Sequence, residues 1–314
     1  MIVVISHPAD THAVRVMERL TRRGCGAFLF DIADFPADGT LTIDYTDPGS
    51  PRARLDHRTA GLVELSEATA VWWRRPQFVR LDGITDPAAR GFVYGEWHEA
   101  LYGLYQLLTC PWMNPPGADD AASRKVGQLR VASRLGLRVP ATLMTSDAAE
   151  ATAFIRRYGI GNTIYKIFSA THQVWRETRL VTADDLAHLD ALRLAPVIFQ
   201  EYVPAVADVR VTIVGGQLFA MAIDSRGTSY EVDFRVSLAE ARTSAVVLPD
   251  DVAGLLSDLV KQYGLVYAAV DLRLTPEGEY VFLEINPAGE FLFAEAGTGL
   301  PITDAVAGWL AAPT

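Results

Sequence analysis

Apolar positions near the start of the chain form two kinds of pattern: short continuous runs and a segment with helical spacing. Residues 2–5 and 27–31 are short apolar runs, the pattern of buried strands. Residues 11–22 between them have apolar positions at helical spacing. Residues 36–60 are polar and contain Pro and Gly, which predicts a loop or an extended excursion. Strand, helix and strand in this order predict an α/β beginning.

The same pattern continues to a break near residue 114. Residues 71–73 predict another buried strand, and residues 87–109 predict a long helix. Residues 114–117, Asn-Pro-Pro-Gly, then interrupt the pattern. We place a domain boundary there.

Strands dominate the second half, and from residue 208 onward they are expected to be antiparallel, giving an α+β class. Helices are predicted at residues 119–135, 148–158, 250–263 and 302–310. Strands are predicted at residues 139–144, 163–168, 197–202, 209–214 and 218–223, followed by a hairpin over 267–286. We expect three parts: residues 1–115, residues 116–200 and residues 201–314.

Composition narrows the possible partners and surroundings. The 314 residues carry a net charge of −10 at pH 7, which argues against nucleic acid as the main partner. We expect no membrane span, because uninterrupted apolar runs stay shorter than about 18 residues. The two cysteines, Cys25 and Cys110, lack metal-type spacing and favour a reducing cytoplasm.

The final hairpin places oxygen ligands on one face. If Thr275 pairs with Tyr280, Asp271 lies opposite Glu284. One face then carries Ala269, Asp271, Arg273, Phe282, Glu284 and Asn286, and the other carries Val270, Leu272, Leu274, Val281, Leu283 and Ile285.

Two opposed carboxylates repel each other unless a cation lies between them. Two carboxylates and an amide oxygen suit a hard cation such as magnesium. Asp271, Glu284 and Asn286 are therefore the predicted metal ligands. The alternative is an ordinary solvated hairpin face.

Lysine is rare among the 28 basic residues, and only Lys125, Lys166 and Lys261 are lysines. Lys166 lies inside an apolar run, which is costly unless an anion such as phosphate accompanies the ammonium. The alternative is a lysine whose head group reaches solvent from an edge strand.

These pieces, in this order, resemble the ATP-grasp superfamily over about residues 115–300. The resemblance implies an ATP-grasp fold in which an N-terminal α/β domain precedes a central lobe and a C-terminal antiparallel-sheet lobe. It implies ATP and Mg²⁺ as cofactors. The residues implied to contact ATP are Lys125, Lys166, Gln200, Glu201, Tyr202, Val203, Asp208 and Arg210. Magnesium would be held by Asp271, Glu284 and Asn286, and Arg226 and Arg235 would stabilise the transferring phosphoryl group.

Residues 72–76, Trp-Trp-Arg-Arg-Pro, resemble a segment of the graspetide (microviridin-type) peptide maturases, which are related to the ribosomal-protein glutamate ligases. Residues 137–142 and 300–303 also resemble that family. The resemblance implies that Arg74 and Arg75 bind a substrate carboxylate. The alternative is a structural ion-pair cluster at the end of a strand.

The implied reaction is phosphorylation of Asp or Glu side chains in a ribosomal precursor peptide. A hydroxyl or amine of the same peptide would then attack the acyl phosphate, giving an ester (or amide) crosslink. The implied partner is a precursor with a leader and an acidic, Thr-containing core, and the enzyme is expected to be a homodimer.

Two alternatives remain. The chain would add a free amino acid to a peptide or small acid, or it would bind nucleotide without catalysis. Two departures from the family motivate the second alternative: Glu290 where the family usually has an amide, and few glycines at residues 169–171.

Overall fold

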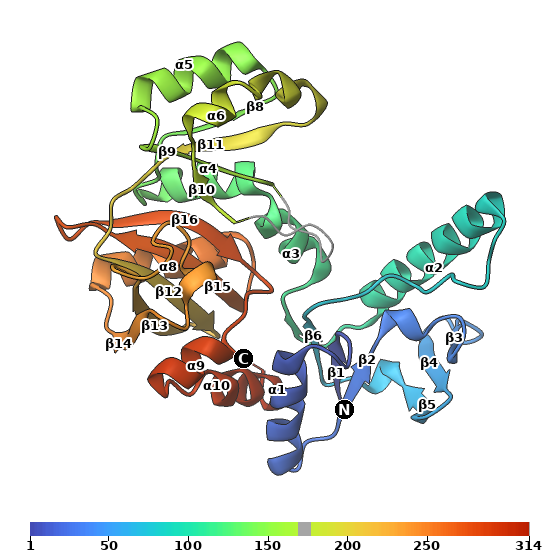
Figure 1. Cartoon of the computed structure of the whole chain (residues 1–314). Coiled ribbons are helices and arrows are strands. Elements are labelled where there is room, and N and C mark those ends of the chain that lie inside the picture. The colour runs from blue at the N-terminus through green and yellow to red at the C-terminus, as the bar shows by residue number, and fades with distance from the viewer. Residues whose placement is uncertain (169–176, 314) are drawn as a thin grey trace.

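The computed structural model describes residues 1–168 and 177–313. The Gly-poor segment at residues 169–171 lies outside them. Figure 1 shows three parts in chain order: an N-terminal domain, a central lobe and a C-terminal lobe whose last helices return to the N-terminal domain. None of the helices in the described ranges has the length and apolar character needed to cross a bilayer.

A parallel sheet organises the N-terminal domain, in the order β2-β1-β6-β7. Its strands are β1 (Ile2–Ile5), β2 (Ala27–Phe30), β6 (Ala70–Trp73) and β7 (Trp112–Met113). Helix α1 (Thr11–Arg22) has the predicted bounds, and Asp10 accepts from the His12 N–H at its start. Alternate β1 residues enter separate apolar clusters: Ile2 and Val4 face one, and Val3 and Ile5 face the other.

Of the two alternatives predicted for residues 36–60, a loop or an extended excursion, the structure has the extended one. The region forms an antiparallel sheet, continued by residues 61–64, with strands β3 (Gly39–Asp44), β4 (Arg52–His57) and β5 (Gly61–Glu64). Its polar composition conceals a period of two, because Ala53 and Leu55 are buried while the arginines beside them are exposed. Helix α2 (Pro87–Leu107) then projects from the domain.

The central lobe begins with two helices where one was predicted over 119–135. Arg124 has φ −82° and ψ 102°, an extended conformation that separates α3 (Pro116–Ser123) from α4 (Lys125–Leu135). As a result, Lys125 is the first residue of α4. Gly136 ends α4 at a φ of 99°, a left-handed conformation that favours glycine.

The rest of the central lobe is an antiparallel sheet in the order β10-β9-β11-β8. Its elements are β8 (Thr142–Thr145), α5 (Ala148–Tyr158), β9 (Thr163–Lys166), β10 (Arg179–Leu180), α6 (Ala183–Leu186) and β11 (Val197–Glu201). Helix α5 packs on this sheet through a small apolar cluster that includes Ile155 and Phe199.

The C-terminal lobe is a five-stranded antiparallel sheet in the order β14-β13-β12-β15-β16. Its strands are β12 (Ala207–Val214), β13 (Gln217–Asp224), β14 (Arg242–Val246), β15 (Tyr267–Leu274) and β16 (Tyr280–Asn286). Its helices are α7 (Phe234–Ser237), α8 (Asp250–Gln262), α9 (Leu292–Thr298) and α10 (Ile302–Ala311). One face packs on α8 and α4, while α9 and α10 extend the core toward α1.

The register of the final hairpin is right at one end and wrong at the other. Asp271 lies opposite Glu284, as predicted. Nearer the turn, Leu274 pairs with Tyr280, and Thr275 belongs to the turn. A bulge after Asp271 restores the register.

The bulge also reverses part of the predicted division between the two faces. Phe282 pairs with Leu272 and is buried in the core, although it was predicted on the oxygen-rich face. Leu283 lines the cavity described below, although it was predicted on the apolar face.

Candidate active site

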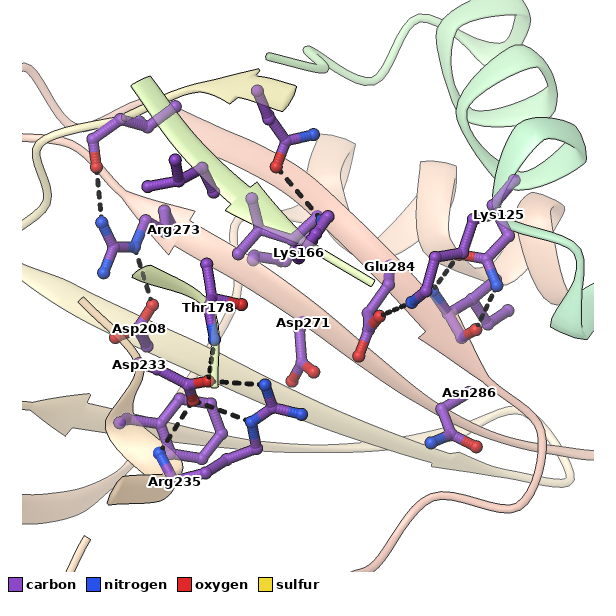
Figure 2. A pocket seen from close by; sticks show the side chains of 18 of the residues that line it. Lys125, Lys166, Thr178, Asp208, Asp233, Arg235, Asp271, Arg273, Glu284 and Asn286 are labelled. Atoms are coloured by element: carbon purple, nitrogen blue, oxygen red, sulfur yellow. Dashed lines mark hydrogen bonds and ion pairs between the residues drawn. The ribbon is translucent and has the colours of Figure 1, made fainter. Parts of the chain in front are cut away.

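A cavity of about 540 Å³ lies between the central lobe and the five-stranded sheet. Eleven of the predicted ATP, metal and phosphoryl-group residues line it, together with Arg75. The eleven are Lys125, Lys166, Gln200, Glu201, Tyr202, Val203, Asp208, Arg235, Asp271, Glu284 and Asn286. Figure 2 shows the labelled members of this set around one space, contributed by α4, β9, β12, α7, β15 and β16.

Each of the two opposed carboxylates has a cation of the same chain beside it. Glu284 Oε2 lies 2.5 Å from Lys125 Nζ, and Asp271 Oδ1 lies 2.8 Å from Arg210 Nε. Burial alone would raise the pKa of Glu284, but the charges of Lys125 and Lys166 outweigh it and lower that pKa. Burial raises the pKa of Asp271, with the Glu284 charge adding to it and the Arg210 charge opposing it.

These residues fit a divalent cation. Asp271 Oδ1 is buried and accepts no hydrogen bond from the described residues, because Arg210 is near it but poorly aligned. No three His, Cys, Asp or Glu side chains of the described ranges form a metal-holding group. The site has two carboxylates and the Asn286 amide, so a metal bound there needs further oxygen ligands, as magnesium finds in phosphate and water.

Lys166 is the cation best placed to meet an anion. Its ammonium donates to Gln200 Oε1 at 3.2 Å, a neutral partner, while Gln200 Nε2 donates to Thr142 Oγ1 at 2.8 Å. Burial lowers the pKa of Lys166 to about 8, although Glu284 opposes the shift. A phosphate entering the cavity would give the Lys166 ammonium a negatively charged partner.

Arg273 joins several segments around the cavity, and no role was predicted for it. Its Nε donates to Asp208 Oδ1 at 2.9 Å and its Nη1 to the Val203 carbonyl at 2.8 Å. Its Nη2 donates to two further carbonyls, and the Tyr202 ring lies 5.0 Å from its Cζ. Its position within a mostly apolar strand was the sequence signal that could have indicated a buried, paired arginine.

Asp233 fixes the position of Arg235 beneath the carboxylates. It accepts from Arg235 Nε at 2.7 Å and from Nη2 at 2.6 Å, and its other contacts include the Thr178 N–H at 3.1 Å. The Arg235 guanidinium acts electrostatically on both Glu284 and Asp271. A fixed positive charge therefore lies beside the candidate metal ligands.

Profiles of two families match adjoining parts of this sequence. The MvdD pre-ATP grasp domain matches residues 1–120, and the RimK-like ATP-grasp domain matches residues 122–310. The chain belongs to the RimK-like ATP-grasp family. Comparison with curated protein sequences gives no match.

Solved structures of ATP-grasp ligases resemble the whole chain. A RiPP-associated ATP-grasp ligase from Chryseobacterium gregarium, in complex with ADP and a leader and core peptide, has a TM-score of 0.89 and 26% identity, with 100% of this chain and 97% of that chain covered. The macrocyclase MdnC from Microcystis aeruginosa MRC, bound with the precursor peptide MdnA, has a TM-score of 0.85 and 30% identity, with 98% of each chain covered.

A further relative carries both metal and nucleotide. The ATP-grasp ligase PsnB, complexed with a phosphomimetic variant of a minimal precursor, Mg and ADP, has a TM-score of 0.79 and 26% identity, with 99% of this chain and 97% of that chain covered. These findings confirm the predicted resemblance to the graspetide maturases, the ATP-grasp fold and the class of enzyme, an ATP-dependent ligase.

In this ATP-grasp ligase the two adjacent arginines that follow β6 lie in different surroundings. Arg75 lines the cavity, whereas Arg74 is 1% exposed. Arg74 Nε donates to Asp10 at 3.3 Å and its Nη1 donates to the Gly289 carbonyl at 2.8 Å. The position of Arg74 fits the alternative interpretation, a structural ion-pair cluster.

Two other arginines with predicted roles do not line the cavity. Arg210 lies behind Asp271, buried, with the rings of Phe234 and Phe293 5.9 Å and 5.4 Å from its Cζ. Arg226 is exposed and pairs with Asp224 through Nε at 2.8 Å and Nη2 at 2.9 Å. Neither arrangement brings the guanidinium into the space between the lobes.

Proposed function

We propose that this ligase uses Mg-ATP to phosphorylate Asp or Glu side chains of a ribosomal precursor peptide and to crosslink them within that peptide. The observation that carries the proposal is the meeting of Lys125, Lys166 and the Asp271–Glu284 pair with Arg75 in one cavity. Arg75 comes from the domain that precedes the nucleotide-binding lobes. Relatives bound to precursor peptides support a peptide as the substrate.

The nucleotide would lie between the lobes. Lys125 and Lys166 would bind its phosphates, since both ammonium groups border the carboxylate pair. Residues 200–203 would meet the adenine, and Asp208, which Arg273 holds, would lie near the ribose. Arg210 would act indirectly by holding Asp271.

Asp271, Glu284 and Asn286 would hold magnesium. Bound magnesium supplies charge neutralisation to phosphates and polarises the phosphoryl group for transfer. Arg235, fixed by Asp233, would add positive charge where negative charge develops. We assign that role to Arg235 alone, because Arg226 lies outside the cavity and pairs with Asp224.

The chemistry divides into two transfers. A carboxylate oxygen of the peptide attacks the γ-phosphorus, the bond from that phosphorus to the bridging oxygen breaks, and ADP leaves. The resulting acyl phosphate is attacked at its carbonyl carbon by a Ser or Thr hydroxyl, or by a Lys amine, of the same peptide. An ester (or amide) bond forms, inorganic phosphate leaves, and the nucleophile releases a proton. Arg75 would bind the carboxylate before the first transfer.

A second copy of the chain would pack on α2. This helix projects from the N-terminal domain and exposes Phe92, Tyr94 and Tyr102 at 68%, 39% and 45%. Their size favours burial against another chain. We therefore propose a homodimer, and Phe92→Ser together with Tyr102→Ser should shift the mass measured by light scattering toward the monomer.

We also propose that the ligase acts in the cytoplasm, because Cys25 and Cys110 form no disulfide.

The proposal is tested with the precursor peptide expected from the gene beside that of the ligase. Incubation with Mg-ATP should lower the peptide mass by one water per crosslink. A mass increase by one amino-acid residue would instead favour the ligase that adds a free amino acid. ATP binding without ADP release would favour the inactive nucleotide-binding module. An unchanged mass with ADP released would contradict the crosslinking activity.

A further inference from the structure

Arg75 reaches the cavity already engaged by a carboxylate of its own chain. Among the described residues that line the cavity, Arg75 alone precedes residue 116. Its Nη2 lies 3.2 Å from Glu290 Oε1 and 3.5 Å from the Ala288 carbonyl oxygen. The group proposed to bind a substrate carboxylate is therefore paired with an internal one.

The backbone on both sides of Glu290 is fixed without help from that ion pair. The Gly289 carbonyl accepts from Arg74 Nη1 and from Tyr267 Oη, both at 2.8 Å. The Phe291 N–H donates to His12 Nδ1 at 3.4 Å. These bonds hold the chain at residues 289 and 291, so the Glu290 side chain emerges beside Arg75 whether or not the two interact.

Close packing also limits movement of this segment. A Cβ added at Gly289 would lie 2.3 Å from the Ala269 Cβ, so the backbone there lies directly against β15. Loss of the Glu290 charge should therefore leave the segment in place. A substitution can therefore remove the Glu290 charge without moving the backbone around it.

We propose that Glu290 is an internal competitor of the substrate carboxylate and thereby a specificity-determining residue. The inference rests on the proposed function, in which Arg75 binds an Asp or Glu side chain of the peptide. Glu290 carries the same carboxylate group as such a side chain, so the substrate must displace it from Arg75. A peptide that binds through additional contacts can do so, whereas a small isolated acid has less to offset the competition.

The expected effect is modest because the pair is partly solvated. The Arg75 and Glu290 side chains are 34% and 56% exposed. Exposed ion pairs of this kind change an equilibrium by about twofold to fivefold. That range is measurable in a direct binding experiment.

The experiment uses a fluorescein-labelled synthetic peptide of Thr, Asp and Glu and the full-length ligase with Mg²⁺ and a non-hydrolysable ATP analogue. Fluorescence anisotropy should show that Glu290→Gln binds the peptide about twofold to fivefold more tightly than the unaltered ligase. Glu277→Gln, which removes the same charge from the exposed β15–β16 turn, should leave the affinity unchanged. In a chain that already carries Arg75→Gln, adding Glu290→Gln should give no gain.

Two results would overturn the inference. One is equal peptide affinity, or no detectable binding, in both the Glu290→Gln variant and the unaltered ligase. The other is a gain that persists in the Arg75→Gln background, because the effect would then not pass through Arg75. Failure of the proposed function has a separate readout, since an unchanged precursor mass in the Mg-ATP assay does not depend on this peptide.

Discussion

Lys125 Nζ lies 2.5 Å from Glu284 Oε2, so the first residue of α4 neutralises a carboxylate of β16. The extended conformation of Arg124 starts α4 at this lysine and thereby places the ammonium at the cavity. Arg210 stands in the same relation to Asp271. The cavity therefore holds its two carboxylates with positive charge beside each of them.

Replacing Lys125 by Met should weaken nucleotide use. The variant loses a phosphate-binding charge and leaves Glu284 without its nearest cation, so we expect kcat/KM for ATP to fall about 10²-fold to 10³-fold. ADP release in the presence of precursor measures the effect. Lys261→Met is the matched control, because Lys261 is exposed on α8 and should be silent. Equal losses in both variants would contradict the assignment.

Glu284→Gln should separate metal binding from folding. Glutamine keeps the shape of the side chain but removes one of two carboxylates, so the Mn²⁺ affinity measured by electron paramagnetic resonance should fall with nucleotide analogue present. The melting temperature should change little, since loss of the pair with Lys125 is offset by loss of the repulsion between Glu284 and Asp271. Glu279→Gln on the exposed end of the hairpin is the control. Unchanged Mn²⁺ affinity in Glu284→Gln would remove Glu284 from the metal site.

Nucleotide affinity should depend on the charge of Lys166. Burial lowers the pKa of this lysine to about 8. Below that pH the ammonium is charged and attracts phosphate, and above it the empty enzyme holds a neutral amine. Affinity for the ATP analogue should therefore decline as the pH rises through about 8, and titration calorimetry from pH 7 to pH 9.5 measures it. Lys166→Arg stays charged and should lack this decline. The same decline in both proteins would point to another group.

Arg273→Met should lower the free energy of unfolding, because several contacts of this arginine are lost together. The substitution leaves Asp208 buried without its partner and removes the donor to the Val203 carbonyl. The free energy of unfolding should fall by about 3–5 kcal/mol, measured by urea denaturation. Arg242→Met, which breaks an ion pair of an arginine 82% exposed, should cost less than about 0.5 kcal/mol. Similar costs for the two variants would contradict a structural role of Arg273.

The hairpin shows what a period of two can and cannot predict. Alternation counted from an assumed Thr275–Tyr280 pair places Asp271 opposite Glu284, and this pairing is found because the bulge after Asp271 offsets the one-residue difference at the turn. The bulge depends on how Phe282 and Leu283 divide between core and cavity, and both are apolar. The sequence pattern therefore does not show which of the two side chains lies in the core and which lines the cavity.

The arginines show a second limit of prediction from the sequence. Arg74 and Arg75 are adjacent and chemically identical, so the sequence assigned both to the substrate. Their separation depends on Asp10 and on the carbonyl of Gly289, more than two hundred residues later in the chain. Arg226 is held by a local pair instead, with Asp224 two residues before it, which a strand and turn pattern does not reveal. The helix break at Arg124 is equally hidden, because residues 119–135 have an unbroken helical pattern.

The central claim is that the peptide carboxylate receives the γ-phosphoryl group before it is crosslinked. The most direct measurement uses precursor peptide whose Asp and Glu side-chain carboxylates carry oxygen-18. Mass spectrometry of the released inorganic phosphate should find one labelled oxygen per crosslink, transferred when the acyl phosphate breaks down. Unlabelled phosphate together with crosslinked peptide, or label in AMP, would contradict the account.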